Sequence, residues 1–211
     1  MKKIIIKLIV VSFFVVVCFS SCEKKEELKC DCFYYNFDEK ICLQQDKNKI
    51  FIKFAPDADV EQLRNIINRE NSLRLTSDYN LEDSIFRFAV LQSEKLQLIP
   101  LTIIKAFKNY KEVVSVGYLL YVEGFTAKPL GCTDEFVVKL KETTTYEQLQ
   151  ELADKNFCTI GEKNQFVQNQ FMLYVSKISV LNTMQTANLF YETGLFEYTS
   201  PNFILFNAFD V

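Results

Sequence analysis

The hydrophobic and polar positions of this chain follow one pattern twice. Residues 49–123 and residues 134–207 each read as a strand, a helix, a strand or extended loop, a strand, a helix and a strand. The apolar run at residues 50–54 predicts the first strand, and residues 136–140 repeat it in the second half. Self-similarity of this length indicates two copies of one structural unit.

Apolar stripes and capping residues predict the helices. A stripe at residues 60–67 follows Asp57 and Asp59, either of which can cap a helix. In the second half, Thr144 and Glu147 have the spacing of a capping box, which satisfies two free backbone donors at a helix start. The second helices are expected at about residues 99–110 and 180–193, the latter ending before Gly194.

This order of elements predicts the fold class. Strand–helix–strand twice over is the ferredoxin-like arrangement, in which two helices cover one face of a four-stranded antiparallel sheet. We therefore expect an α+β fold of tandem ferredoxin-like (βαββαβ) modules at residues 46–124 and 134–211, preceded by a β-hairpin at residues 32–45. The face without helices has to be covered by the sister module, by a partner protein or by a missing part of the same polypeptide.

The first residues predict export. Lys2, Lys3 and Lys7 precede an apolar run at residues 8–19 that contains one polar residue, Ser12, and small residues then lead to Cys22. This is the order of a signal peptide. The apolar run is shorter than the ~20 residues that a membrane-spanning helix needs.

Residues 19–22 (Phe-Ser-Ser-Cys) resemble the lipobox of bacterial lipoproteins. The resemblance implies that residues 1–21 are removed as a signal peptide and that Cys22 becomes the lipid-carrying N-terminus. The alternative is an ordinary signal peptide cut near Ser21. The charged residues after Cys22 predict a solvated tether at residues 22–31. We expect a protein of the cell envelope, anchored by lipid at the outer membrane or the cell surface.

Composition and charge indicate a folded protein and argue against one class of partner. Apolar residues make up 49% and charged residues 24%, which is typical of a globular fold. Loss of residues 1–21 removes three lysines and no acid, so the net charge of −3 becomes −6. An acidic protein without clustered Lys and Arg is not suited to a nucleic-acid partner.

The sequence provides no familiar catalytic set. It contains no histidine, so neither Ser-His-Asp nor Cys-His catalysis can be built. Its five glycines are scattered and form no phosphate-binding loop, so no cofactor is expected. Three adjacent carboxylate pairs read as turns and solvated faces: Glu26–Glu27, Asp38–Glu39 and Glu82–Asp83. We expect no enzyme activity and no catalytic residues.

The chain contains seven cysteines, and Cys18 and Cys22 belong to the export segment. The remaining five are Cys30, Cys32, Cys42, Cys132 and Cys158. A disulfide between Cys32 and Cys42 would join the two strands of the predicted hairpin, and buried free thiols are the alternative. A zinc site is not expected, because the single residue between Cys30 and Cys32 is too short a spacing and there is no histidine.

Residues 188–203 resemble the end of the N-terminal propeptides of subtilisin-like serine peptidases. The resemblance also covers the strand at 136–140 and the helix at 146–156, and so most of residues 134–207. It implies a ferredoxin-like propeptide that packs its open sheet face on the peptidase, lays its C-terminal tail along the substrate cleft, assists folding and inhibits.

For this chain the resemblance implies a cleft tail near its end, with Phe206 or Phe209 as apolar anchors. The positions concerned are Phe206, Asn207, Ala208 and Phe209. The implied partner is a subtilisin-like serine peptidase, either in a longer precursor of which this is the N-terminal region or as a separate polypeptide. The alternative is a structural or protein-interaction lipoprotein of the cell envelope.

Overall fold

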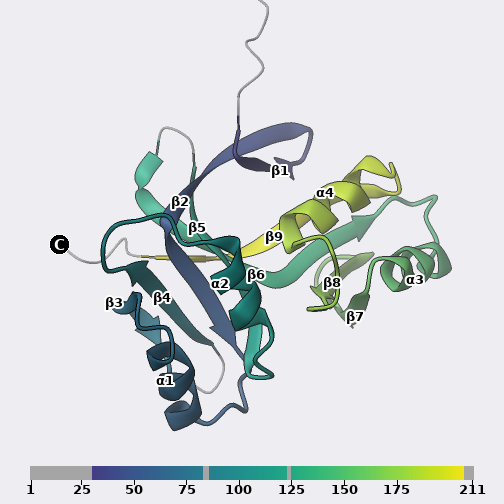
Figure 1. Cartoon of the computed structure of the whole chain (residues 1–211). Helices are drawn as coiled ribbons and strands as arrows, with labels where there is room; N and C mark the ends of the chain where they lie inside the picture. Colours follow the sequence, from purple (N-terminus) through teal and green to yellow (C-terminus); the bar gives the residue numbers. More distant parts are fainter. Residues whose placement is uncertain (1–29, 83–85, 123–124, 207–211) are drawn as a thin grey trace, which may run out of the picture.

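A computed structural model describes residues 30–82, 86–122 and 125–206, which form nine β-strands and four α-helices (Figure 1). The strands are β1 (Cys32–Asn36), β2 (Glu39–Phe54), β3 (Leu73–Asn80), β4 (Arg87–Ser93), β5 (Val113–Val122), β6 (Phe125–Leu140), β7 (Cys158–Lys163), β8 (Gln170–Val175) and β9 (Phe196–Leu205). The helices are α1 (Val60–Asn68), α2 (Leu101–Lys108), α3 (Tyr146–Lys155) and α4 (Thr183–Glu192). Within the described part of the chain, no helix has the length and hydrophobicity needed to cross a membrane. The predicted signal peptide at 1–21 and Cys22 lie outside the described residues.

All nine strands belong to one antiparallel sheet with the strand order β3-β4-β2-β5-β6-β8-β7. Two further strands lie beside this path, β1 along β2 and β9 along β6. The two 16-residue strands β2 and β6 hold the sheet together, since each pairs with three neighbours. Figure 1 shows α1 and α2 beside the strands of the first half, and α3 and α4 beside those of the second half.

The prediction of tandem ferredoxin-like modules is wrong, because the chain forms one continuous, mostly antiparallel sheet with four helices. Strands β5 and β6 pair directly, with Leu120 opposite Leu130 and Val122 opposite Phe125. Residues 125–133, which the predicted boundaries left between the modules, form the first part of β6. Pairing satisfies the backbone groups of two strand edges, but a hydrophobic pattern does not show which edges meet.

The capping box of α3 lies one residue later than predicted. Thr145 accepts a hydrogen bond from the backbone of Gln148, whose side chain accepts one from the backbone of Thr145. The predicted cap, Thr144, is buried and donates instead to the carbonyl of Leu195 at 2.6 Å. Thr144 therefore ties the start of α3 to the turn before β9 rather than capping the helix.

Each half has its own core between the helices and the sheet. In the first half, Leu63 and Ile67 of α1 and Phe107 of α2 pack on Ile52 and Leu91 of the strands. The core of the second half consists of Phe136, Val138, Leu140, Leu149, Ala153, Cys158, Phe171, Leu173, Ala187, Phe190 and Phe196. The apolar stripe seen in the sequence at residues 60–67 thus marks the buried face of α1.

A hairpin is present where the sequence predicted one, with β1 paired to the first part of β2. Its second strand continues without interruption into the central strand of the first half. The hairpin also packs on α4, where the Asn188 amide donates to the carbonyl of Phe33 at 2.9 Å and the rings of Tyr35 and Tyr191 lie 4.4 Å apart. It therefore connects the first half to the second.

Candidate functional site

The structure pairs Cys30 with Cys42, so the predicted disulfide between Cys32 and Cys42 is wrong. The strand register explains the difference, because Cys42 lies opposite Phe33 and Cys32 lies opposite Leu43. Neighbouring residues of a strand point to opposite faces of a sheet. Cys32 and Cys42 are therefore one position out of register for a cross-strand bond.

Among the described residues, three cysteines are free thiols: Cys32, Cys132 and Cys158. Burial raises the pKa of Cys32 to about 11 and the pKa values of Cys132 and Cys158 to about 12. All three stay protonated near neutral pH, and a protonated thiol is a poor nucleophile and metal ligand. In residues 30–82, 86–122 and 125–206, no three Cys, Asp or Glu side chains gather closely enough to hold a metal ion.

A buried ion cluster joins the two halves. Lys53 of β2 is 7% exposed, and its Nζ lies 2.7 Å from Asp134 Oδ1 and in contact with Glu135 of β6. The Asn202 amide donates to the other carboxylate oxygen of Glu135 at 2.7 Å. Burial lowers the pKa of Lys53, but the hydrogen bonds and charges of the two acids outweigh it and hold the pKa above its ordinary value. The cluster has one excess negative charge and serves to fix β2 against β6.

The predicted cleft tail begins inside the fold. Phe206 is 4% exposed, and its ring lies 5.7 Å from that of Phe51 and 5.3 Å from that of Phe88. Its backbone N–H donates to the carbonyl of Pro129 at 2.9 Å. Phe206 is therefore not free to enter a peptidase cleft as predicted. The other predicted tail positions, Asn207, Ala208 and Phe209, lie outside the described residues.

Phe206 belongs to a second apolar layer, on the sheet face of the first half that its helices leave uncovered. Phe51, Val90 and Leu119 are at most 1% exposed there, and Ile204 packs beside them. The backbone of β6 also packs closely against Phe51, since a Cβ placed on Gly131 would lie 2.5 Å from the Phe51 ring. This face of the first half is closed by the second half of the chain.

The corresponding face of the second half is not closed in this way. Core residues such as Phe136, Val138 and Leu173 alternate along β6 and β8 with side chains that point to the opposite side of the sheet. We call this side the open face. It consists of Val137, Lys139, Gly161, Gln170, Met172, Tyr174, Tyr198 and Ser200.

The open face combines apolar groups with hydrogen-bonding groups. Tyr174 is 39% exposed, and its ring lies so close to Gly161 that a Cβ there would be 2.6 Å away. Met172 is half-buried next to it, opposite Val137. An accessible aromatic ring beside apolar and polar groups is the composition found at protein-binding surfaces.

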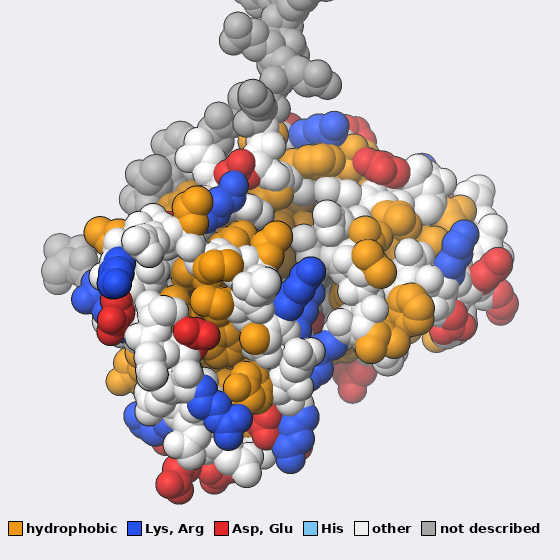
Figure 2. Space-filling view, in the orientation of Figure 1, with side chains coloured by type: hydrophobic (Ala, Val, Ile, Leu, Met, Phe, Trp, Pro, Cys, Tyr) orange, Lys and Arg blue, Asp and Glu red, His pale blue; other side chains and the backbone are white. Residues whose placement is uncertain are grey.

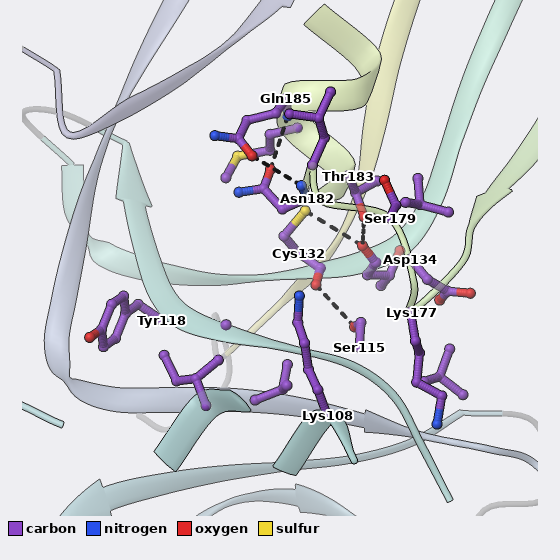
Figure 3. A pocket seen from close by; sticks show the side chains of 18 of the residues that line it. Lys108, Ser115, Tyr118, Cys132, Asp134, Lys177, Ser179, Asn182, Thr183 and Gln185 are labelled. Atoms are coloured by element: carbon purple, nitrogen blue, oxygen red, sulfur yellow. Dashed lines mark hydrogen bonds between the residues drawn. The ribbon is translucent and has the colours of Figure 1, made fainter. Parts of the chain in front are cut away.

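A cavity of about 510 Å³ lies between the two halves (Figure 3). Its lining comes from β2, α2, β5, β6, the end of β8 and the loop between β8 and α4, and the first turn of α4. Ile104, Leu120 and Met184 form buried parts of its wall, while Leu101 and Val180 stand 61% and 93% exposed at its edge. Figure 2 shows hydrophobic side chains gathered around α2 on this side of the molecule.

Most polar side chains around the cavity already have partners in the protein. Thr183 donates to the carbonyl of Thr133 at 2.6 Å, and Ser115 donates to that of Cys132 at 3.3 Å (Figure 3). Asn182 caps α4. Asp134, the lining carboxylate, binds Lys53 on its other side. Among the described residues, the lining lysines Lys47 and Lys108 have no such partner. Lys47 is exposed, whereas Lys108 of α2 is half-buried and points into the cavity in Figure 3.

Lys53, Asp134 and the cavity were not predicted from the sequence. One signal was present, because Lys53 is a charged residue inside the apolar run 50–54 that was assigned to a buried strand. The cavity has no comparable signal, since its lining extends from Gln45 to Gln185. No protein-family model and no curated protein matches this chain.

Proposed function

We propose that this chain is a non-catalytic binding module of an exported, lipid-anchored protein, and that it holds a partner protein on the open face. The observation that carries the proposal is the difference between the two halves. Phe51 in the first half is 1% exposed under Phe206, whereas Tyr174 in the second half is 39% exposed. A sheet face with an accessible aromatic ring gains free energy when a partner covers it.

Export and lipid anchoring are part of the same proposal. They are supported by the basic residues, the apolar run and the lipobox-like residues 19–22 of the sequence. Anchoring at Cys22 followed by a charged tether would place the folded part at a membrane surface of the cell envelope. Labelling of living cells with a radioactive fatty acid should mark the protein, and a Cys22→Ser variant should lose the label.

The open face is tested by copurification from membranes. Tyr174→Arg should remove the partner, because it places a charge where the partner buries an aromatic ring. Tyr79→Arg is the matched control, since Tyr79 is 45% exposed on a strand of the first half. Equal recovery of the partner with wild type and with Tyr174→Arg would contradict the proposal.

A subtilisin-like serine peptidase is the second candidate for the partner. It is supported by the resemblance of residues 134–207 to subtilase propeptides, because this segment contains the whole open face. The buried position of Phe206 leaves the face, rather than a tail that starts at Phe206, as the contact. Purified protein should slow a subtilisin-type enzyme, and Tyr174→Arg should restore its rate. No inhibition across a panel of such enzymes would exclude this partner class.

A further inference from the structure

The cavity between the two halves has an apolar wall that no part of the described chain fills. Ile104, Leu120 and Met184 are at most 7% exposed, and they line a space of about 510 Å³. Protein pockets for small molecules have volumes of roughly 300–1,000 Å³ and are mostly apolar. The two exposed side chains at the edge, Leu101 and Val180, extend the apolar surface to the opening.

The wall suits a flexible aliphatic group. Tyr118 is the one aromatic residue of the lining among the described residues, and its hydroxyl is held by the carbonyl of Ile99 at 2.6 Å. Met184 has an unbranched side chain that adapts its shape to a chain-like ligand. Gly117 adds space, because a Cβ built on it would meet nothing within 4 Å.

The charges around the cavity favour an anion. Asp134 is neutralised by Lys53, and the Lys177 ammonium donates to the carbonyl of Tyr110 at 2.7 Å. Lys108 has no hydrogen bond or ion pair with any described residue. It is half-buried and its ammonium points into the cavity (Figure 3). A partly desolvated ammonium gains most from a carboxylate, which accepts its hydrogen bonds and balances its charge.

From these observations we infer that the cavity binds a single fatty acid, with the carboxylate on Lys108 and the aliphatic chain along Ile104, Leu120 and Met184. A monoanion fits better than a phosphate, because among the described lining residues Lys108 is the one half-buried lysine, whereas Lys47 and Lys177 are exposed to water. This inference concerns a different surface from the open face and is independent of the partner protein.

The experiment is titration calorimetry of the chain from residue 23 onward with dodecanoate below its micelle concentration. One molecule should bind per protein. Lys108→Met should weaken binding about tenfold or more, because it removes a charge-assisted hydrogen bond. Lys105→Met is the matched control, since Lys105 is an exposed lysine on the same helix outside the cavity lining, and its variant should bind like wild type.

Two further measurements separate the contribution of the ligand's head group to binding from that of its aliphatic chain. Dodecanol should bind wild type more weakly than dodecanoate does. It should bind Lys108→Met as well as it binds wild type. Gly117→Leu should abolish binding of both ligands, because a Cβ at this lining position meets nothing within 4 Å and the larger side chain should occupy the space of the ligand. Tyr174→Arg should bind dodecanoate normally. Failure of wild type to bind, equal affinity of Lys108→Met and wild type, or unchanged binding by Gly117→Leu would overturn the inference.

Discussion

The two halves of the molecule have the same order of elements, but they differ on the sheet face that carries no helices. In the first half, Phe51 is covered by Phe206 and by the backbone at Gly131. In the second half, Tyr174 stays 39% exposed and Met172 lies half-buried beside it. The chain therefore contains two similar sheet faces, one covered by other parts of the chain and one partly exposed.

The difference arises because strand β9 serves both halves. Its first residue, Phe196, belongs to the core of the second half. Its last residue, Leu205, pairs with Leu130 of β6, beside the first half. Phe206 then fills the layer over Phe51. The first half is thereby stabilised from within the chain, and the second half keeps a surface available for binding.

The largest effect is expected from separating the two halves at their ion cluster. Lys53→Met leaves the buried carboxylates of Asp134 and Glu135 without their cation, and removal of one partner of a buried pair typically costs 3–5 kcal/mol. We expect a loss of about 4 kcal/mol in the free energy of unfolding, measured by urea denaturation. Arg64→Met breaks an exposed pair with Glu82 and should cost less than about 1 kcal/mol. Similar losses for the two variants would contradict a bridging role for Lys53.

A somewhat smaller effect is expected from uncovering the first half. Phe206→Ala removes a ring that is 4% exposed, and large-to-small changes of buried Phe cost about 3 kcal/mol or more. Tyr174→Ala on the open face should cost less than about 1 kcal/mol, because its ring is already partly in water. Thermal and urea unfolding of both variants give the comparison. If Tyr174→Ala were the more destabilising change, the two faces would have been assigned the wrong way round.

Two glycines allow a finer version of the same comparison. Gly131→Ala places a methyl group 2.5 Å from the Phe51 ring, which is fixed in a closed layer, and should cost about 2 kcal/mol. Gly161→Ala places one 2.6 Å from the Tyr174 ring, which can move towards solvent, and 3.2 Å from the carbonyl oxygen of Met172, and it should cost less than Gly131→Ala, about 1 kcal/mol. Both values come from chemical denaturation at the same pH. Equal losses would show that the Tyr174 ring is held as firmly as Phe51.

The smallest effect concerns alkaline pH. The pKa of Lys53 is raised above its ordinary value of 10.5, so the charged form is favoured in the folded protein. This stabilisation is fully present below the ordinary pKa and is lost as the pH rises through the raised value. The difference in unfolding free energy between wild type and Lys53→Met should therefore narrow above about pH 10.5. A constant difference up to pH 12 would show that the Lys53 charge contributes nothing.

Local features of the sequence were sufficient for the elements and for part of their boundaries. The apolar stripe at residues 60–67 became the buried face of α1, and the turn at residues 36–39 became the hairpin. The capping box of α3 was displaced by one position, because Thr144 found a buried partner in Leu195 that no local rule could supply. The predicted disulfide was wrong for a related reason, since the register of β1 and β2 places Phe33 rather than Cys32 opposite Cys42, and Cys30, which precedes β1, is the partner.

The candidate binding surfaces were less accessible to prediction. The sequence suggested that a sheet face would lack helices, but it did not show that Phe206 closes that face in one half alone. The cavity depends on the divergence of β5 from β6 after their short pairing at Leu120 and Leu130. Such a gap arises from the path of the backbone, and residue types do not report it.

Strands, helices and their buried sides follow from the order of residues alone, because each depends on side chains a few positions apart. The joining of the halves into one sheet, the link between Lys53 and Asp134 and the cover over Phe51 were decided by tertiary structure. Burial requires only that an apolar group finds apolar neighbours and that a charge finds its opposite. Many residues of this chain could meet that requirement, and only the folded backbone selects the ones that do.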